Sequence, residues 1–284
     1  MRCNFRVLTG AAIVAGCLGL ISAVPAQAAT LDCTSAPGTC TGGTATSIAG
    51  LYSFAGALWT TTDIQATGSG VIDPFVRLVA NTDIVSGMNT SGNLTQDENA
   101  SPTFTHDLNA SAVPVVTING STYYEFLLDI NQTGSDPLLS LSSLSLCVSD
   151  TGNRTITGTA EICTLAAGQG NGAGPSQLVY DLDATANNSV ELNYNFNSGS
   201  GSGDLFVYIP TSSLVNSPGD FMYLFSSFGG TGTTAGLNND NDGFEEWAVR
   251  TVSTPTQIPD GGATLTLLGL ALGGIGAARR FMKS

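Results

Sequence analysis

Positive charge is almost absent from the central part of this chain. The sequence has 8 Lys and Arg against 22 Asp and Glu, and the two ends hold Arg2, Arg6, Arg279, Arg280 and Lys283. Residues 29–257 contain 3 arginines, no lysine and 21 acidic residues, an acidic excess of 18. Such a field repels nucleic acid and anionic lipid headgroups and attracts cations. We therefore expect no nucleic-acid partner.

Motifs for catalysis and cofactor binding are also missing. The sequence has no phosphate loop, no dinucleotide fingerprint and one histidine, His106, next to Asp107. Histidine is the usual general base near neutral pH, but no serine stands in a nucleophile elbow. Glu125 and Asp129 resemble a glycosidase carboxylate pair, yet any solvated strand face spaces carboxylates in this way. We expect no enzymatic activity, with a polysaccharide hydrolase as a minor alternative.

Cysteines are few but even in number after residue 29. They are Cys33, Cys40, Cys147 and Cys163. In an oxidising compartment four cysteines predict two disulfides, for which three connectivities exist. Proximity in sequence favours Cys33 with Cys40 and Cys147 with Cys163. A metal site is the alternative, but the spacing contains no CxxC pair.

The first 28 residues read as a secretory signal. A basic start is followed by the apolar run 7–24 and by small residues ending at Ala28. This order predicts export through the Sec machinery and cleavage by signal peptidase near Ala28. Lipidation at Cys17 is an alternative, although the residues after Cys17 remain apolar.

The last 27 residues have three parts. Ile258, Pro259, Asp260, Gly261 and Gly262 precede an uncharged stretch at 263–278, and Arg279 and Arg280 follow it. A helix of this length is roughly 24 Å long, slightly short for a bilayer core of about 30 Å. The basic end favours the cytoplasmic side. A short C-terminal transmembrane helix is therefore expected, and a role as a plain membrane anchor is one alternative.

This motif, helix and basic tail together resemble the C-terminal sorting domains of exosortase substrates. The tail looks like the VPDSG-CTERM relative of PEP-CTERM signals, with Ile258 in place of valine and Gly261 in place of serine. The resemblance implies an exosortase-type processing enzyme as partner and cutting near the motif. It also implies a transient stay in the inner membrane, followed by the cell surface or extracellular matrix.

The body at 29–257 is rich in alternating apolar and polar residues, which is typical of half-buried strands. Leu139 and Leu141 alternate with serines, and the phase slips at Ser142 and Ser143, which predicts a β-bulge. No sustained helical periodicity appears. We expect an all-β, antiparallel β-sandwich of jelly-roll type. Its predicted strands lie near 51–59, 71–80, 113–118, 124–130, 139–148, 178–182, 190–196, 204–209, 221–228 and 246–252.

Parts of this body also resemble exosortase-sorted proteins of proteobacteria. The similar segments are Tyr124–Gln132, Gly203–Pro210 and Asn241–Val249. The resemblance implies a shared sandwich and a surface location, and it brings no biochemical activity with it.

The densest polar cluster is a calcium-loop candidate. Asn238, Asp240, Asp242 and Glu246 stand at positions 1, 3, 5 and 9 of such a loop, with glycine at position 6. Position 12 is Val249, so the usual bidentate glutamate is missing. Glu245 or Glu246 could supply the missing carboxylate ligand only if the backbone followed a different path from that of the usual calcium loop. A plain turn entering a strand is the alternative reading.

Two functions fit these features. The first is a non-enzymatic surface protein of the exopolysaccharide or biofilm matrix. The second is a carbohydrate-binding β-sandwich module, with calcium as a candidate stabilising cofactor and extracellular polysaccharide as partner. Trp59 and Trp247 are candidate stacking platforms for sugars, but their alternating apolar context favours a place in the core.

Overall fold

The structure is a computed structural model that confirms the all-β prediction. It describes residues 28–62, 72–79, 83–154, 176–199, 201, 203–214, 220–230 and 238–250. In these ranges the regular elements are strands and three short 3-10 helices: η1 (Ala110–Ala112), η3 (Tyr194–Phe196) and η4 (Thr211–Ser213). None of the described helices is long and apolar enough to cross a bilayer. The predicted signal and C-terminal helices lie outside the described residues.

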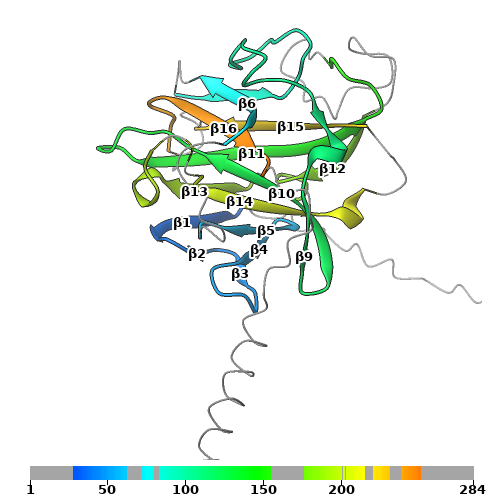
Figure 1. Ribbon diagram of the computed structural model, residues 1–284. Coiled ribbons are helices and arrows are strands. Elements are labelled where there is room, and N and C mark those ends of the chain that lie inside the picture. The colour runs from blue at the N-terminus through cyan, green and yellow to red at the C-terminus, as the bar shows by residue number, and fades with distance from the viewer. Residues whose placement is uncertain are drawn as a thin grey trace, which may run out of the picture.

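The first sheet is built around the long strand β11 (Figure 1). Its strands run in the order β2 (Thr39–Thr41), β1 (Thr30–Ala36), β13 (Ser189–Asn193), β11 (Leu138–Ser149), β15 (Phe221–Phe228) and β7 (Val85–Met88). β12 (Ser176–Asp181) pairs with β11, and β8 (Leu108–Asn109) pairs with β15. Among the described strands only β1 and β13 are parallel, so the sandwich is rich in antiparallel pairs without being purely antiparallel.

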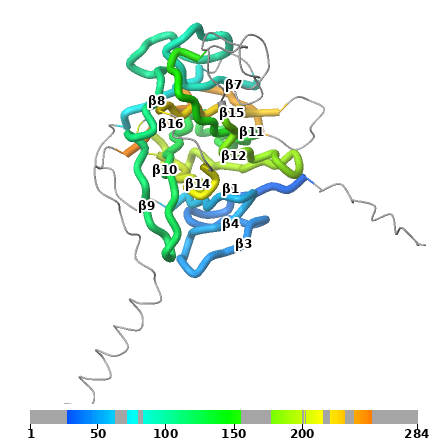
Figure 2. Tube along the Cα trace, turned by 90° about the vertical axis from the view of Figure 1, so that its right-hand side faces the viewer, coloured from blue at the N-terminus to red at the C-terminus, as the bar shows by residue number. Residues whose placement is uncertain are grey.

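The second sheet faces the first across the core. Its order is β3 (Thr44–Ala45), β4 (Tyr52–Phe54), β5 (Ala57–Thr60), β14 (Leu205–Pro210), β10 (Ser121–Asp129), β16 (Phe244–Ala248) and β6 (Pro74–Val79). β9 (Val115–Ile118) forms a hairpin with β10. In Figure 2, β9 and β10 lie on one side and β11, β12 and β15 on the other.

The main core lies between the two sheets. Phe126, Leu128 and Ile130 extend from the β10 side, while Leu144 and Leu146 extend from β11, and all five are fully buried. Burial of such apolar surface stabilises the fold by about 25 cal/mol per Å². The two inner faces therefore supply the main stabilisation of the sandwich.

Both tryptophans belong to this core. Trp59 and Trp247 have no exposed surface. The Trp247 Nε1 group in β16 donates to the Ser226 hydroxyl in β15 over 3.0 Å, which joins the two sheets. The prediction that these aromatic residues pack in the core is confirmed, and neither is available to stack on a sugar.

The predicted bulge in β11 is confirmed. Leu141 pairs with Phe228, and the next pair is Ser143 with Ser227, so Ser142 is the additional residue. The extra residue moves the phase of β11 and keeps leucines on the core face on both sides of the slip.

Several strand predictions were partly wrong. The predicted strand at 51–59 is a hairpin of two strands, β4 and β5, and the predicted strand at 246–252 is β16, which begins at Phe244 and ends at Ala248. The predicted strand at 190–196 ends at Asn193, because the Asn193 side chain accepts the Asn195 N–H and starts η3. In β12, Leu178 is 45% exposed although its alternation with Tyr180 predicted burial. The β11–β12 register shifts between Leu146 and Cys147, which reverses the facing of this part of β12.

The first predicted disulfide is confirmed. Cys33 and Cys40 are bonded and connect β1 to β2. Cys147 is buried in β11 and is disulfide-bonded, while Cys163 lies outside the described residues. The pairing of these two cysteines stays a prediction.

Candidate functional site

The candidate site is built by the loop 238–243, which leads into β16. At its start, Asn238 exchanges two hydrogen bonds with Ser140 of β11, through backbone N to Oγ (2.6 Å) and through its carbonyl (3.0 Å). The Asn238 amide also donates to Glu191 Oε2 in β13 over 2.6 Å. Hydrogen bonds therefore connect the first residue of the loop to the first sheet.

Hydrogen bonds hold the other end of the loop next to β10 of the second sheet. Asn241 Oδ1 accepts the Thr133 N–H over 2.8 Å, and its amide donates to the Asp136 carbonyl over 2.8 Å. Gly243 has φ +75°, and a Cβ atom there would lie 2.3 Å from the Asn131 amide nitrogen. Only glycine fits this turn, which packs the loop against the end of β10.

Three polar side chains meet beneath the loop in what we call the buried carboxylate cluster: Asp240, Glu245 and Gln132. They are 3%, 0% and 2% exposed. Gln132 Nε2 donates to Asp240 Oδ1 over 3.1 Å and to Glu245 Oε1 over 3.2 Å. The oxygens Asp240 Oδ2, Glu245 Oε2 and Gln132 Oε1 are buried without any hydrogen-bond partner. Three unsatisfied acceptors on side chains that are joined by hydrogen bonds are unusual in a folded protein.

The surroundings of the cluster disfavour negative charge. Burial raises the pKa of Asp240 to about 6, and the neighbouring Asp242 adds to this shift. Burial also raises the pKa of Glu245 well above its ordinary value, with further contributions from Asp240 and Asp129. Both carboxyl groups therefore hold a proton more readily than exposed carboxyl groups do.

The structure separates the four residues predicted as calcium ligands. Asn238 binds Glu191, Asp242 is exposed, and Glu246 contacts Arg77. Only Asp240 enters the cluster. In the described ranges no three His, Cys, Asp or Glu side chains converge on one metal position. The predicted ligand set is therefore wrong, because Glu245 and Glu246 are neighbours in β16 and point to opposite faces.

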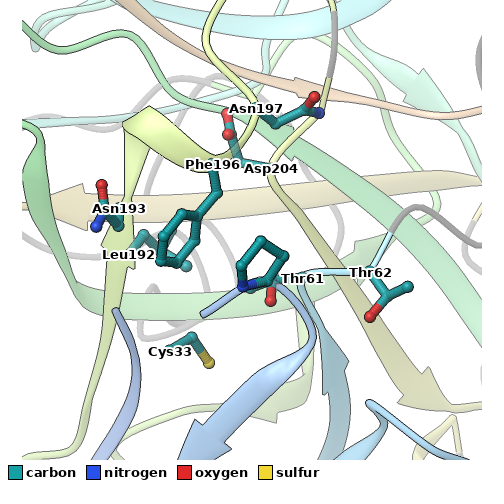
Figure 3. A pocket seen from close by; sticks show the side chains of 9 residues that line it. Cys33, Thr61, Thr62, Leu192, Asn193, Phe196, Asn197 and Asp204 are labelled. Atoms are coloured by element: carbon teal, nitrogen blue, oxygen red, sulfur yellow. The ribbon is translucent and has the colours of Figure 1, made fainter. Parts of the chain in front are cut away.

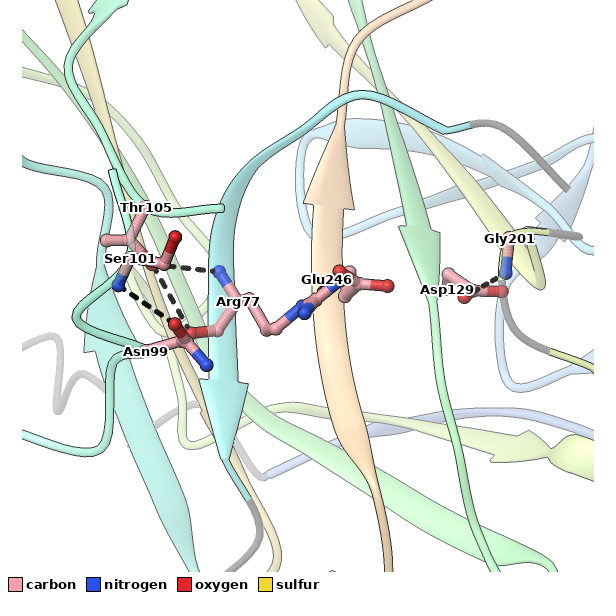
Figure 4. A network of polar contacts seen from close by, with 7 residues as sticks. All are labelled: Arg77, Asn99, Ser101, Thr105, Asp129, Gly201 and Glu246. Carbon is pink, nitrogen blue, oxygen red and sulfur yellow. Dashed lines mark hydrogen bonds and ion pairs between the residues drawn. The ribbon is translucent and has the colours of Figure 1, made fainter. Parts of the chain in front are cut away.

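Glu246 belongs to a separate polar network on the other face of the second sheet (Figure 4). Arg77 of β6 donates from Nε to Glu246 over 2.5 Å. Its guanidinium lies 3.3 Å from the Phe104 ring centroid and 4.7 Å from that of Phe244. Asp129 of β10 accepts the Gly201 N–H over 2.7 Å. This network satisfies its charges internally.

The prediction of a solvated face on β10 was wrong. Glu125 and Asp129 are each 1% exposed, and Arg250 binds Glu125 through two nitrogens. A second apolar cluster covers this face: Leu51, Val116, Ile118, Leu127, Phe206 and Tyr208. The two carboxylates serve as buried partners inside the protein, so they do not form an accessible glycosidase pair.

His106 and Asp107 do not form a catalytic pair either. His106 Nδ1 is buried and has no hydrogen-bond partner. The Asp107 carboxylate accepts the backbone N–H groups of Ser91 and Asn153 and the Tyr223 hydroxyl. Asp107 therefore orders a loop junction.

A separate cleft of about 200 Å³ opens where β1, η3 and the end of β5 meet (Figure 3). Sequence reasoning did not identify it, because its residues come from three distant segments. They are Cys33, Pro37, Thr61, Thr62, Leu192, Asn193, Phe196, Asn197 and Asp204. The half-buried Phe196 ring and the amides of Asn193 and Asn197 give the cleft an aromatic surface beside polar groups.

Asp204 lies at the edge of this cleft. Its Oδ2 accepts the Ile130 N–H over 2.8 Å, while its Oδ1 is buried with no partner. Burial raises the pKa of this carboxyl well above its ordinary value, and the nearby Asp129 adds to the shift.

Comparison with known proteins identifies the C-terminal end of the chain. The family model for the VPDSG-CTERM motif matches residues 257–282. No curated protein and no solved structure matches the chain. The predicted sorting tail is confirmed, and the resemblance of the body to other sorted proteins stays a prediction.

Proposed function

We propose that this chain, an exosortase-sorted protein with a VPDSG-CTERM motif at residues 257–282, serves as a non-enzymatic component of the extracellular polymer matrix. The motif is the observation that carries the proposal. It supports export and a surface location, and the tail is the segment that an exosortase would recognise and cut.

The described surface suits a hydrated matrix. Arg77, Arg154 and Arg250 are the only basic residues between 29 and 257, and none of them is exposed. Arg77 and Arg250 pair with glutamates, while Arg154 donates to Ser149 Oγ over 3.0 Å. Ionised groups at the described surface are therefore acidic, which favours solubility and repels anionic lipid.

The first prediction concerns processing of the tail. The protein recovered from culture medium is expected to end near Asp260, whereas replacement of Pro259 and Asp260 by alanine leaves residues 261–284 attached. Intact-mass analysis of cell and medium fractions measures this directly. Thr254→Ala, outside the matched residues, is the control and is expected to be processed normally. A full-length chain found only in the membranes would instead indicate a permanent anchor.

A second candidate function is carbohydrate binding at the cleft beside η3. Sugar-binding sites combine an aromatic face with polar groups. Phe196 offers the aromatic face, and beside it lie Asn193 and Asn197, whose amides already donate to the carbonyls of Thr34 and Gly203. A cleft of about 200 Å³ would hold one sugar ring or the end of a chain. The ligand class would then be the polysaccharide of the matrix itself.

Glycan arrays test this candidate. Phe196→Ala is expected to weaken retention on a bound polysaccharide roughly five- to tenfold, because it removes a stacking surface worth about 1 kcal/mol. Leu178→Ala, an exposed apolar residue in β12, is the matched control and should leave retention unchanged. If the unaltered protein binds no glycan, the module hypothesis fails while the sorting assignment stands.

A further inference from the structure

We infer that Asp240, Glu245 and Gln132 bind a divalent cation, calcium by its chemistry, beneath the loop 238–243. The proposal uses Asp240 from the predicted loop but replaces its other three ligands. It draws on the proposed function only because calcium-binding modules outside the cell operate at about 10⁻⁴–10⁻³ M.

The orphaned oxygens carry this inference. Asp240 Oδ2, Glu245 Oε2 and Gln132 Oε1 are all acceptors, all buried and all without partners. Leaving such groups unsatisfied is costly, and the cost is greatest for carboxylates. A bound cation would be a partner for both carboxylates together, and for the Gln132 oxygen once that carboxamide turns toward them, whereas a single hydrogen-bond donor would serve fewer of these groups.

Gln132 is the residue that adapts. Its Nε2 now donates to both carboxylates, which is the arrangement expected when no cation separates them. Rotation of the carboxamide by half a turn exchanges Nε2 with Oε1. The oxygen then faces Asp240 Oδ1 and Glu245 Oε1, the two atoms to which Nε2 donates here, and a cation held among the three side chains takes it as a ligand.

The donor set favours calcium over other ions. Two carboxylates match the charge of a divalent cation, and the third side-chain donor is an amide oxygen, so every ligand is hard. Calcium accepts backbone carbonyls and waters in an irregular shell of six to eight oxygens, whereas magnesium demands near-octahedral geometry. No described histidine or cysteine takes part in the cluster, which disfavours zinc.

Binding here would join the two sheets. Glu245 belongs to β16 and Gln132 follows β10, both of the second sheet. Asp240 lies in the loop that is tied to the first sheet through Asn238 and Ser140. The cation would therefore connect the sheets at one end of the sandwich and order the exposed loop.

The experiment compares the chain recovered from cells in about 10 mM calcium chloride and in EGTA. At saturation a cation bound only by the folded state raises Tm, here by about 5 to 10 °C. Asp240→Asn and Glu245→Gln are expected to lose at least tenfold in calcium affinity by calorimetric titration. Asp150→Asn, which changes an exposed carboxylate outside the loop and the cluster, should bind as the unaltered protein does.

Glu245→Gln separates a ligand from a merely structural residue. It removes an unpaired buried charge, so in EGTA the variant should be at least as stable as the unaltered protein while no longer responding to calcium. An unchanged Tm of the unaltered protein in calcium would overturn the site. So would loss of affinity in Asp150→Asn with affinity retained in Glu245→Gln. In either case tail processing would be unaffected, which keeps this test distinct from that of the proposed function.

Discussion

Replacement of Arg250 by methionine is expected to lower the free energy of unfolding by about 3–5 kcal/mol. Arg250 binds both oxygens of Glu125, a side chain that is 1% exposed. Its guanidinium also lies 4.9 Å from the Phe206 ring centroid. Methionine keeps the apolar packing but leaves a carboxylate buried without its counter-charge. The loss of the counter-charge therefore dominates the effect.

Urea unfolding of the single and double variants measures this contribution. Adding Glu125→Gln to the Arg250→Met variant removes the stranded charge and is expected to recover most of the lost stability. Asp136→Asn changes an exposed carboxylate and should alter the free energy of unfolding by no more than about 0.5 kcal/mol. A double variant as unstable as the single one would show that packing of Arg250, rather than its charge, stabilises this region.

Local patterns in the sequence were sufficient to predict the sandwich. Alternation identifies β10 and β13, and the slip at Ser142 predicted the bulge because a one-residue insertion changes the phase of every later side chain. The Cys33–Cys40 disulfide was also predictable, since the two cysteines are separated by only seven positions. These features depend on neighbours in the chain, which a single sequence displays directly.

The burial of charged residues was not predictable in the same way. Alternation in β10 shows that one face is apolar, but the cover over Glu125 and Asp129 comes from other segments. Glu125 meets Arg250 across 125 positions, and Arg77 meets Glu246 across 169. No local pattern links such residues, so exposure was the natural but incorrect expectation.

The candidate cation site was likewise predictable only in part, because its loop is a local feature of the sequence and its other residues come from distant positions. The loop 238–243 was visible as an Asn, Asp and Gly cluster, and Asp240 was correctly included. Gln132 is 108 positions from Asp240 in the sequence. Whether Glu245 or Glu246 belongs to the site depends on which of them points toward the core from β16. Register with β6 and β10 decides that question, and it is a property of the assembled sheet.

Replacement of Asp204 by asparagine is expected to stabilise the protein at neutral and alkaline pH by about 1–3 kcal/mol. The ionised carboxylate has one satisfied oxygen and one buried oxygen without a partner. Asparagine can still accept the Ile130 N–H through Oδ1 while carrying no charge. It also removes repulsion from Asp129, whose carboxylate is held by the Gly201 and Gly203 N–H groups.

The pH dependence of this gain follows from the direction of the pKa shift. In the unfolded chain an aspartate has a pKa near 3.9, and in the fold burial raises the pKa of Asp204 well above its ordinary value. The folded protein thus retains a proton that the unfolded chain has lost. Its stabilising contribution is complete below about pH 4 and disappears as pH rises through the folded-state pKa. Urea unfolding of both proteins from about pH 4 to pH 8 should show their stabilities diverging as pH rises, and equal slopes would refute this role for Asp204.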